Sequence, residues 1–178
     1  MIIKMIKLTL IVLLFSVQSF GQTNMKKENN KYYNLTSVSL LGGSALSGSF
    51  QIVNGYEFNK HWAAGLGIGV ENFYGQNYFP LFIDSKYTLL DQPFSPFCSV
   101  NLGYDLPTEN FERNKGGFMG TGRIGIQHQL GNHFGLITSA GYRYAYIKQN
   151  EWAWWGNNWV EEIREINRFE FRFGFIFR

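Results

Sequence analysis

The chain has 178 residues, and its 16 Lys and Arg nearly balance its 13 Asp and Glu, which argues against a nucleic-acid-binding protein with a basic surface. A single cysteine, Cys98, excludes an intramolecular disulfide and a cysteine-based metal cluster. Seventeen Phe, ten Tyr and five Trp, with twenty Gly and four Pro, are typical of short strands that close into a barrel.

The N-terminus has the pattern of a secretory signal. A basic start precedes an apolar run over residues 8–17, and a small-x-small sequence ends at Gly21. We therefore predict a signal peptide over residues 1–21, with a retained membrane anchor as the alternative. Its removal leaves 157 residues (178 − 21), which is enough for one domain. Residues 22–31 are polar and have no periodic pattern, so they predict a flexible leader.

From Tyr32 onward, apolar residues recur at every second position in segments that turn signals separate. This period predicts strands, because side chains alternate between the two faces of a strand. The predicted strands cover residues 33–43, 47–58, 62–73, 78–89, 94–104, 117–129, 134–147 and 164–177. The first has the weakest alternation, and in the second Asn54 lies on the apolar face. No later apolar run is long enough for a membrane-spanning helix, so any crossing would use strands.

The last predicted strand has the strongest alternation of the chain. Between Arg168 and Phe177 every second residue is Phe, and Arg168, Glu170 and Arg172 stand between them. A soluble protein would bury the Phe row, whereas a membrane barrel would turn it to lipid and the charges to the lumen. A slip of one residue would reverse both faces, so the pattern determines which face points where.

The predicted connections alternate in length. Tight turns over 59–61, 90–93 and 130–133 alternate with the connections 74–77, 105–116 and 148–163. Outer-membrane barrels have short periplasmic turns and longer extracellular loops. We therefore predict an all-β, eight-stranded antiparallel up-and-down transmembrane β-barrel over residues 32–178, with the leader and the tight turns in the periplasm.

Collecting the polar faces predicts a charge network inside the barrel. Eight strands enclose an interior that side chains just fill, so charges there need partners of opposite sign. The predicted members are Glu57, Glu71, Asp84, Lys86, Arg123, Arg143, Arg168, Glu170 and Arg172. Five are basic and four acidic, which makes mutual pairing possible. Such a filled lumen makes a narrow gated pore only a minor alternative.

Aromatic residues gather at two depths of the predicted wall, with aliphatic residues such as Leu66, Ile68 and Ile124 between them. At the periplasmic strand ends these are Tyr56, Phe58, Trp62, Tyr87, Phe94, Phe134 and Phe177. At the other ends they are Phe73, Tyr74, Tyr78, Phe79, Tyr104, Phe118, Tyr144 and Tyr146. Two aromatic girdles around an aliphatic band fit a bilayer. The alternative is that they form the core of a lipocalin-like periplasmic barrel.

These features together resemble the small eight-stranded outer-membrane β-barrels of the OmpA/OmpX type. The resemblance covers residues 33–178 and is one of pattern. It implies a location in the outer membrane of a Gram-negative cell, with membrane lipid and the barrel-assembly machinery as partners. In that family the last strand usually ends in an aromatic residue that the assembly machinery reads. Phe177 matches this signal, although Arg178 follows it.

Within that family, lipid A-modifying enzymes use His, Ser and an acidic residue near the outer surface. Here His61, His128 and His133 all map to the periplasmic end, and no His-x-Ser sequence occurs. Because a base must lie within hydrogen-bond reach of its nucleophile, we expect no enzyme, with a lipid-modifying activity as the alternative. His128 and His133 have no third ligand near them, so we expect no metal and no cofactor.

The predicted connection 148–163 is the most unusual surface segment. It carries four tryptophans, Trp152, Trp154, Trp155 and Trp159. They predict either a platform for a glycan or a protein, or an extension of the outer aromatic girdle. The sequence therefore predicts a non-enzymatic outer-membrane protein with an envelope-structural or surface-interaction role.

Overall fold

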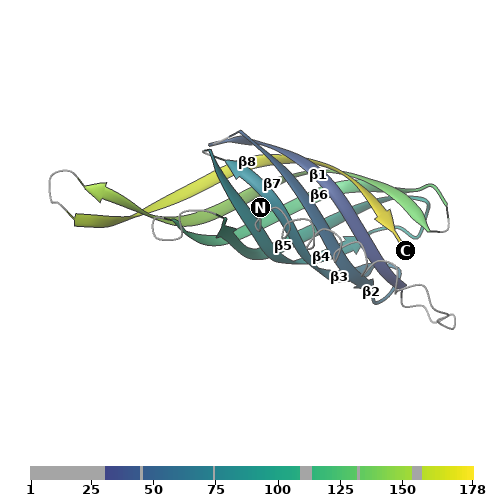
Figure 1. Cartoon of the computed structure of the whole chain (residues 1–178). Coiled ribbons are helices and arrows are strands. Elements are labelled where there is room, and N and C mark those ends of the chain that lie inside the picture. The colour runs from purple at the N-terminus through teal and green to yellow at the C-terminus, as the bar shows by residue number, and fades with distance from the viewer. Residues whose placement is uncertain (1–30, 45, 74, 109–113, 132, 154–157) are drawn as a thin grey trace, which may run out of the picture.

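The computed structural model describes residues 31–178 apart from 45, 74, 109–113, 132 and 154–157. The predicted signal peptide and nearly all of the predicted leader lie outside these residues. The described chain is all-β and closes into a barrel in which each strand pairs antiparallel with the next and β8 pairs with β1 (Figure 1). No helix among the described residues is long and apolar enough to span a membrane.

The eight strands confirm the predicted fold class and strand count. They are β1 (Lys31–Gly43), β2 (Ser47–Glu57), β3 (Trp62–Phe73), β4 (Gln76–Thr88), β5 (Phe94–Pro107), β6 (Asn114–Gln129), β7 (Phe134–Ala153) and β8 (Asn158–Phe177). We call the end with the tight turns 58–61, 89–93 and 130–133 the turn end. The opposite end, where β7 and β8 meet, is the hairpin end.

The prediction for the last connection was wrong. Residues 148–153 and 158–163 are not loop but continue β7 and β8 as a paired ladder, which leaves only 154–157 between the strands. Each of these two strands has 20 residues. Figure 1 shows this hairpin running out past the rest of the barrel, away from the C-terminus. The tryptophans and charges suggested a loop, yet bulky aromatic and β-branched residues also suit strands.

The closed sheet is staggered. Arg168 of β8 pairs directly with Gly43 of β1. When the paired residues are followed the other way round the barrel, from Arg168 through β7 and each strand in turn to β1, the last partner is Tyr33. The sheet therefore closes with a shift of ten residues (43 − 33). Such a stagger tilts the strands and sets the width of the barrel. Because the strands are tilted, side chains that are not paired across neighbouring strands can lie at the same height in the lumen.

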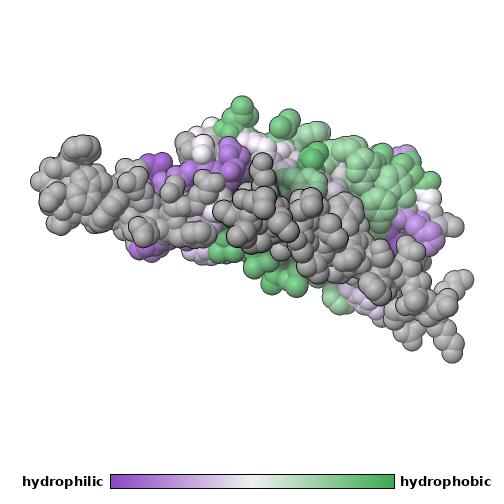
Figure 2. All heavy atoms as spheres, viewed as in Figure 1, coloured by the Kyte–Doolittle hydropathy of each residue, from purple (hydrophilic) through white to green (hydrophobic). Residues whose placement is uncertain are grey.

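The two faces of the wall follow the predicted alternation. On β8 the exposed fractions of Phe169, Phe171 and Phe177 are 72%, 60% and 49%, whereas Arg168 and Arg172 are 0% and 1% exposed. Apolar side chains gather over the visible barrel wall, with hydrophilic residues toward its ends (Figure 2). One predicted girdle residue was placed wrongly, because Tyr78 is buried in the lumen at 1% exposure. Tyr78 lies on the inward row of β4 with Pro80 and Phe82.

Glycines that face the lumen leave room for large neighbours. A Cβ atom at Gly67 would lie 2.2 Å from the ring of Phe82, and one at Gly141 would lie 2.7 Å from Cγ of Arg123. Both distances are far below van der Waals contact. The high glycine content is therefore explained in part by the narrow interior, where a large side chain on one strand requires a small one opposite.

The outward Phe row generates a depth-dependent prediction. Replacing Phe171 with Arg should lower the free energy of unfolding by about 2–4 kcal/mol, because the cation would face acyl chains near the middle of the wall. The same replacement at Phe177, at the turn end, should cost about 0–1 kcal/mol, since Arg there reaches the interface.

Urea titration of protein folded into phospholipid vesicles measures both values, with Phe171→Leu as the conservative control. A barrel that stands in water would tolerate Phe171→Arg at least as well as Phe177→Arg, and that result would contradict an apolar environment.

Candidate functional site

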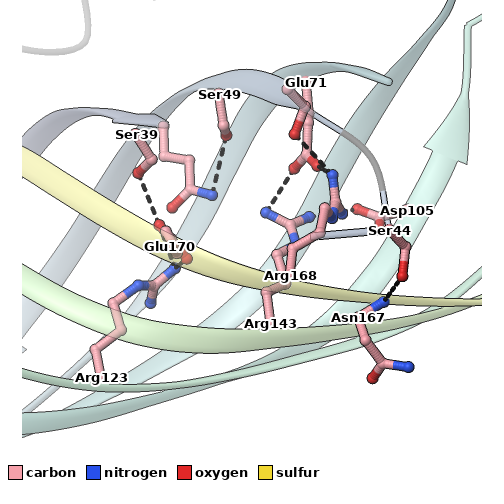
Figure 3. A network of polar contacts seen from close by, with 12 residues as sticks. Ser39, Ser44, Ser49, Glu71, Asp105, Arg123, Arg143, Asn167, Arg168 and Glu170 are labelled. Carbon is pink, nitrogen blue, oxygen red and sulfur yellow. Dashed lines mark hydrogen bonds and ion pairs between the residues drawn. The ribbon is translucent and has the colours of Figure 1, made fainter. Parts of the chain in front are cut away.

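The lumen holds a neutral cluster of four ionic side chains that four strands contribute. We call Glu71 of β3, Asp105 of β5, Arg143 of β7 and Arg168 of β8 the ion cluster. Nη1 of Arg143 lies 2.6 Å from Oε2 of Glu71, and Nη2 of Arg143 lies 2.9 Å from Oδ1 of Asp105. Arg168 donates to the other oxygen of Glu71 and to Ser47. Figure 3 shows the Glu71 carboxylate facing both guanidinium groups.

The side chains of the ion cluster are fully buried, so the barrel can accommodate them only if their charges compensate one another. Each has 0% of its side-chain surface exposed. Two cations and two anions leave no net charge, which limits the cost of removing ions from water. Arg143 contacts both carboxylates and Glu71 contacts both arginines, so the loss of either group would leave a buried charge without its counterion.

A second group lies deeper in the lumen. Nη2 of Arg123 donates to both carboxylate oxygens of Glu170, at 3.1 and 2.9 Å, and Ser39 donates to Glu170 at 2.7 Å. These residues come from β6, β8 and β1, so the pair ties the seam between β8 and β1 to β6 across the lumen. Figure 3 shows this pair beside, and separate from, the ion cluster.

Toward the turn end the predicted lumen charges have weaker or neutral partners. Lys86 donates to Gln127 at 2.9 Å and its Nζ lies 5.2 Å from the ring centre of Tyr33. Tyr33 donates to Asp84 at 3.4 Å. Arg172 is 1% exposed, and its Nε and Nη1 atoms have no hydrogen-bond partner among the described residues. The predicted network is therefore divided into separate groups.

The structure adds members that the sequence analysis missed. Asp105 was assigned to a loop because the predicted strand ended at Tyr104, three residues before the end of β5 at Pro107. Glu57 pairs at 2.7 Å with Nε of Arg178, a residue that was treated only as a departure from a family pattern. Continuing the two-residue period by one step at the end of each strand would have identified both Asp105 and Arg178 as lumen residues.

Apolar side chains occupy the lumen beside the ionic groups. Toward the hairpin end these are Met119, Ala145, Ile147 and Ile166, and toward the turn end Leu35, Phe97, Ile137 and Ile176. All of them are at most 2% exposed. The interior is thus filled by apolar and ionic side chains together, which does not resemble a polar channel.

The other predicted site residues lie at the two ends. Phe177 is outward-facing with its ring centre 5.3 Å from that of Phe134, and the amide of Arg178 donates to the carbonyl of His133. Trp152 and Trp159 pair with each other across the extended hairpin. Their side chains, and all of Trp154 and Trp155, lie outside what the structure describes.

The three histidines all lie at the turn end. Nδ1 of His61 is 2.7 Å from the carbonyl oxygen of Thr88, and Nδ1 of His133 is 3.1 Å from that of Arg178. The ring of His128 contacts Phe94. Among the described residues, no group of three or more His, Cys, Asp and Glu is arranged to hold a metal ion.

Comparison with solved structures finds the same barrel. Neisserial surface protein A superposes with a TM-score of 0.57 at 15% identity, covering 84% of this chain and 97% of that one. The chain has the fold of the small eight-stranded outer-membrane β-barrels. The outer membrane protein AlkL gives 0.60 at 15% identity, covering 87% and 93% of the two chains. OprG from Pseudomonas aeruginosa gives 0.57 at 10% identity, with 85% and 96% covered.

These identities show a shared fold and nothing finer. No protein-family profile matches the sequence, and no curated protein matches it significantly. The fold nevertheless confirms the resemblance drawn from the alternating strands and the Phe-rich last strand.

The ion cluster predicts a strong coupling between Glu71 and Arg168. Glu71→Gln and Arg168→Met should each lower the free energy of unfolding by about 3–5 kcal/mol, because each leaves the buried cluster with a net charge. The double variant keeps the neutral Arg143–Asp105 pair, so it should lose clearly less than the sum.

Urea titration of the folded barrels in vesicles closes this double-mutant cycle. Arg164→Met is the matched control, since the Arg164–Glu162 pair is partly exposed and should contribute about 0–1 kcal/mol. Additive losses would show that Glu71 and Arg168 do not act as a pair.

Proposed function

We propose that this protein resides in the outer membrane of a Gram-negative cell and acts there as a non-enzymatic surface-interaction protein. The main support for this location is the apolar outer wall around a charged lumen. Removing a Phe side chain from water contributes about 1.5–3 kcal/mol, so the outward row on β8 favours a lipid surround. The fold shared with outer-membrane barrels supports the same location.

The proposed orientation places the turn end in the periplasm and the hairpin end outside the cell. Strand β1 begins and β8 ends at the turn end, so a leader before β1 would remain on the periplasmic side. In barrels of this class the connections on the periplasmic side are short and the extracellular ones long. The twenty-residue strands β7 and β8 would then project into the medium.

The projecting hairpin is the part best suited to meet a partner. Pairing of β8 with β1 ends at Arg168 and Gly43, and pairing of β7 with β6 ends at Gln149 and Asn114. Beyond these points the described parts of β7 and β8 pair only with each other, which leaves backbone N–H and C=O groups on both edges of the hairpin without a neighbouring strand. Exposed charges such as Glu162 and Glu165 on β8 discourage uncontrolled strand addition.

The tryptophans of this hairpin supply the chemistry for recognition. Tryptophan is enriched at binding hot spots because it combines a large apolar surface with one hydrogen-bond donor. A glycan or a protein is therefore the proposed class of partner, with Trp152, Trp154, Trp155 and Trp159 as the contact residues. An envelope-structural role, in which these side chains rest on lipid headgroups, is the simpler alternative.

The structure offers little support for the other two alternatives. The filled lumen argues against a pore, because buried apolar and ionic side chains occupy the space through which an ion would have to pass. The turn-end location of His61, His128 and His133 argues against a lipid-modifying enzyme acting on the outer leaflet. An unchanged lipid A mass spectrum from cells with and without the gene would agree with a non-enzymatic role.

The proposed role predicts a specific loss on truncating the tryptophans. Replacing Trp152, Trp154, Trp155 and Trp159 with Ala should abolish binding to a glycan array or to envelope proteins, without changing the amount of folded barrel in the sarkosyl-insoluble membrane fraction. Heat-modifiable gel mobility reports the folded state of each variant.

The matched control replaces Phe169 with Ala, which removes an aromatic ring from the wall and leaves the hairpin intact. Equal binding by the parent and the tryptophan variant would favour the envelope-structural role. Absence of the parent protein from the membrane fraction would remove the proposed location itself.

A further inference from the structure

A hollow lies on the outer surface of the turn end, where the turn 58–61 meets β4. Its volume is about 420 Å³, and Asn59, Lys60, His61, Trp62 and Tyr87 line it. We call it the turn-end hollow. Trp62 and Tyr87 form a cross-strand pair of β3 and β4, and Trp62 is 51% exposed. The hollow thus lies at the predicted aromatic girdle, where the apolar wall meets the polar turns.

The rings of the turn-end hollow are fixed by contacts within the barrel. The ring centre of Tyr87 lies 5.8 Å from that of His61, in a stacked arrangement, and 4.9 Å from that of Trp62, edge to face. Oδ1 of Asn59 accepts from the amides of His61 and Trp62, both at 2.8 Å. The surface is therefore preorganised, which lowers the entropic cost of holding a ligand.

The ring of His61 supplies a hydrogen-bond acceptor. Its Nδ1 lies 2.7 Å from the carbonyl oxygen of Thr88, and because a carbonyl oxygen only accepts, Nδ1 carries the proton. Nε2 of the neutral ring is then an acceptor. The rings of Trp62 and Tyr87 attract cations through their π faces. An acceptor and two aromatic rings together favour an ammonium group as the ligand.

An exposed ion pair lies at the edge of the hollow. Lys60, which lines the hollow, pairs with Asp91 of the turn 89–93, and their side chains are 70% and 58% exposed. Exposed pairs are weak, so both ions can turn to a ligand. The pair presents one positive and one negative charge, which matches a ligand that carries both a phosphate and an ammonium group. A purely anionic ligand would gain Lys60 and meet repulsion from Asp91.

The outer wall next to the hollow indicates what kind of molecule covers it. From Trp62 and Tyr87 the outward rows continue toward the middle of the barrel with Leu66 and Ile83, which are 66% and 60% exposed. In the membrane proposed above, lipid headgroups lie at the depth of an aromatic girdle and acyl chains over the aliphatic band. A phospholipid therefore has its polar group at the turn-end hollow and its chains along Leu66 and Ile83.

We propose that the turn-end hollow binds the headgroup of a zwitterionic phospholipid with a primary ammonium group, of the phosphatidylethanolamine type. Lys60 contacts the phosphate, whereas Asp91 and Nε2 of His61 accept from the ammonium group. The rings of Trp62 and Tyr87 pack against the same headgroup. The proposal rests on the membrane location argued above and goes beyond it, because it assigns one class of lipid to one site on the barrel.

The test measures which lipids the folded barrel retains. The protein is folded into vesicles that contain phosphatidylethanolamine, phosphatidylcholine and phosphatidylglycerol in equal amounts, and it is then extracted into a mild detergent. Native mass spectrometry counts the lipids that stay bound. Phosphatidylethanolamine should be enriched over both others, because phosphatidylcholine has no N–H to donate and phosphatidylglycerol has no cation for Asp91. Both leaflets contain all three lipids, so the result does not depend on which way the barrel faces.

Two variants test the named contacts. Asp91→Asn should lower the retention of phosphatidylethanolamine roughly three- to fivefold, the range expected of an exposed ionic contact, and should raise that of phosphatidylglycerol by removing the repulsion. Tyr87→Leu should lower the retention of phosphatidylethanolamine by removing the ring. Phe134→Leu is the matched control, since Phe134 also follows a histidine in a tight turn and packs on an aromatic ring, that of Phe177. It should leave the retention of all three lipids unchanged.

Each outcome has one meaning. Retention of no lipid, equal retention of the three, or a preference that Asp91→Asn leaves unchanged overturns the proposal. A loss of the same size in Phe134→Leu also overturns it, in favour of general contact between the girdle and headgroups. Heat-modifiable mobility reports that each variant is folded. Membrane fractionation is measured first, so that a protein outside the membrane counts against the proposed function and not against the headgroup site.

Discussion

Closure of the sheet is the constraint on which the rest of this structure depends. In an apolar surround every backbone N–H and C=O must find a partner within the protein, and a closed antiparallel sheet provides one along the whole wall. The pairing of β8 with β1 completes this ring, from Asn34 opposite Phe177 to Gly43 opposite Arg168. Once the ring is closed, alternation leaves each side chain only two choices, the wall or the lumen.

The lumen shows how ionic groups are accommodated in so narrow a space. The ten-residue stagger brings Glu71, Asp105, Arg143 and Arg168 from four strands to one height, where two positive and two negative charges compensate each other. Buried apolar side chains on either side of them, such as Ile147 and Ile137, help to hold these groups away from water. The paired charges and these apolar side chains together fill the interior, so the contacts that stabilise the barrel also close its lumen.

The proposed function is located outside this rigid frame. The hairpin beyond Gln149 has only its own two strands to stabilise it, and it carries the tryptophans and exposed charges through which a partner would be recognised.

The two-residue period by itself determined the fold class, the strand count and the face on which nearly every side chain lies. The Phe row on β8 is the best instance, because Phe and charged residues cannot exchange faces without large cost. Connections were predicted less well. The segment around Glu151 and Trp152 has a loop-like composition, and only its pairing with Trp159 and Val160 showed that it is strand.

Partnerships across the lumen were decided by tertiary structure alone. Alternation placed Glu71 and Arg168 inside, but 97 residues separate them, and no local sequence pattern predicts that they meet. Their meeting follows from the stagger with which the sheet closes, a property of all eight strands together. The sequence thus determined which side of the wall each residue faces, because that depends on neighbours one and two positions away. Which residues touch across the barrel depends on closure, and closure exists only in three dimensions.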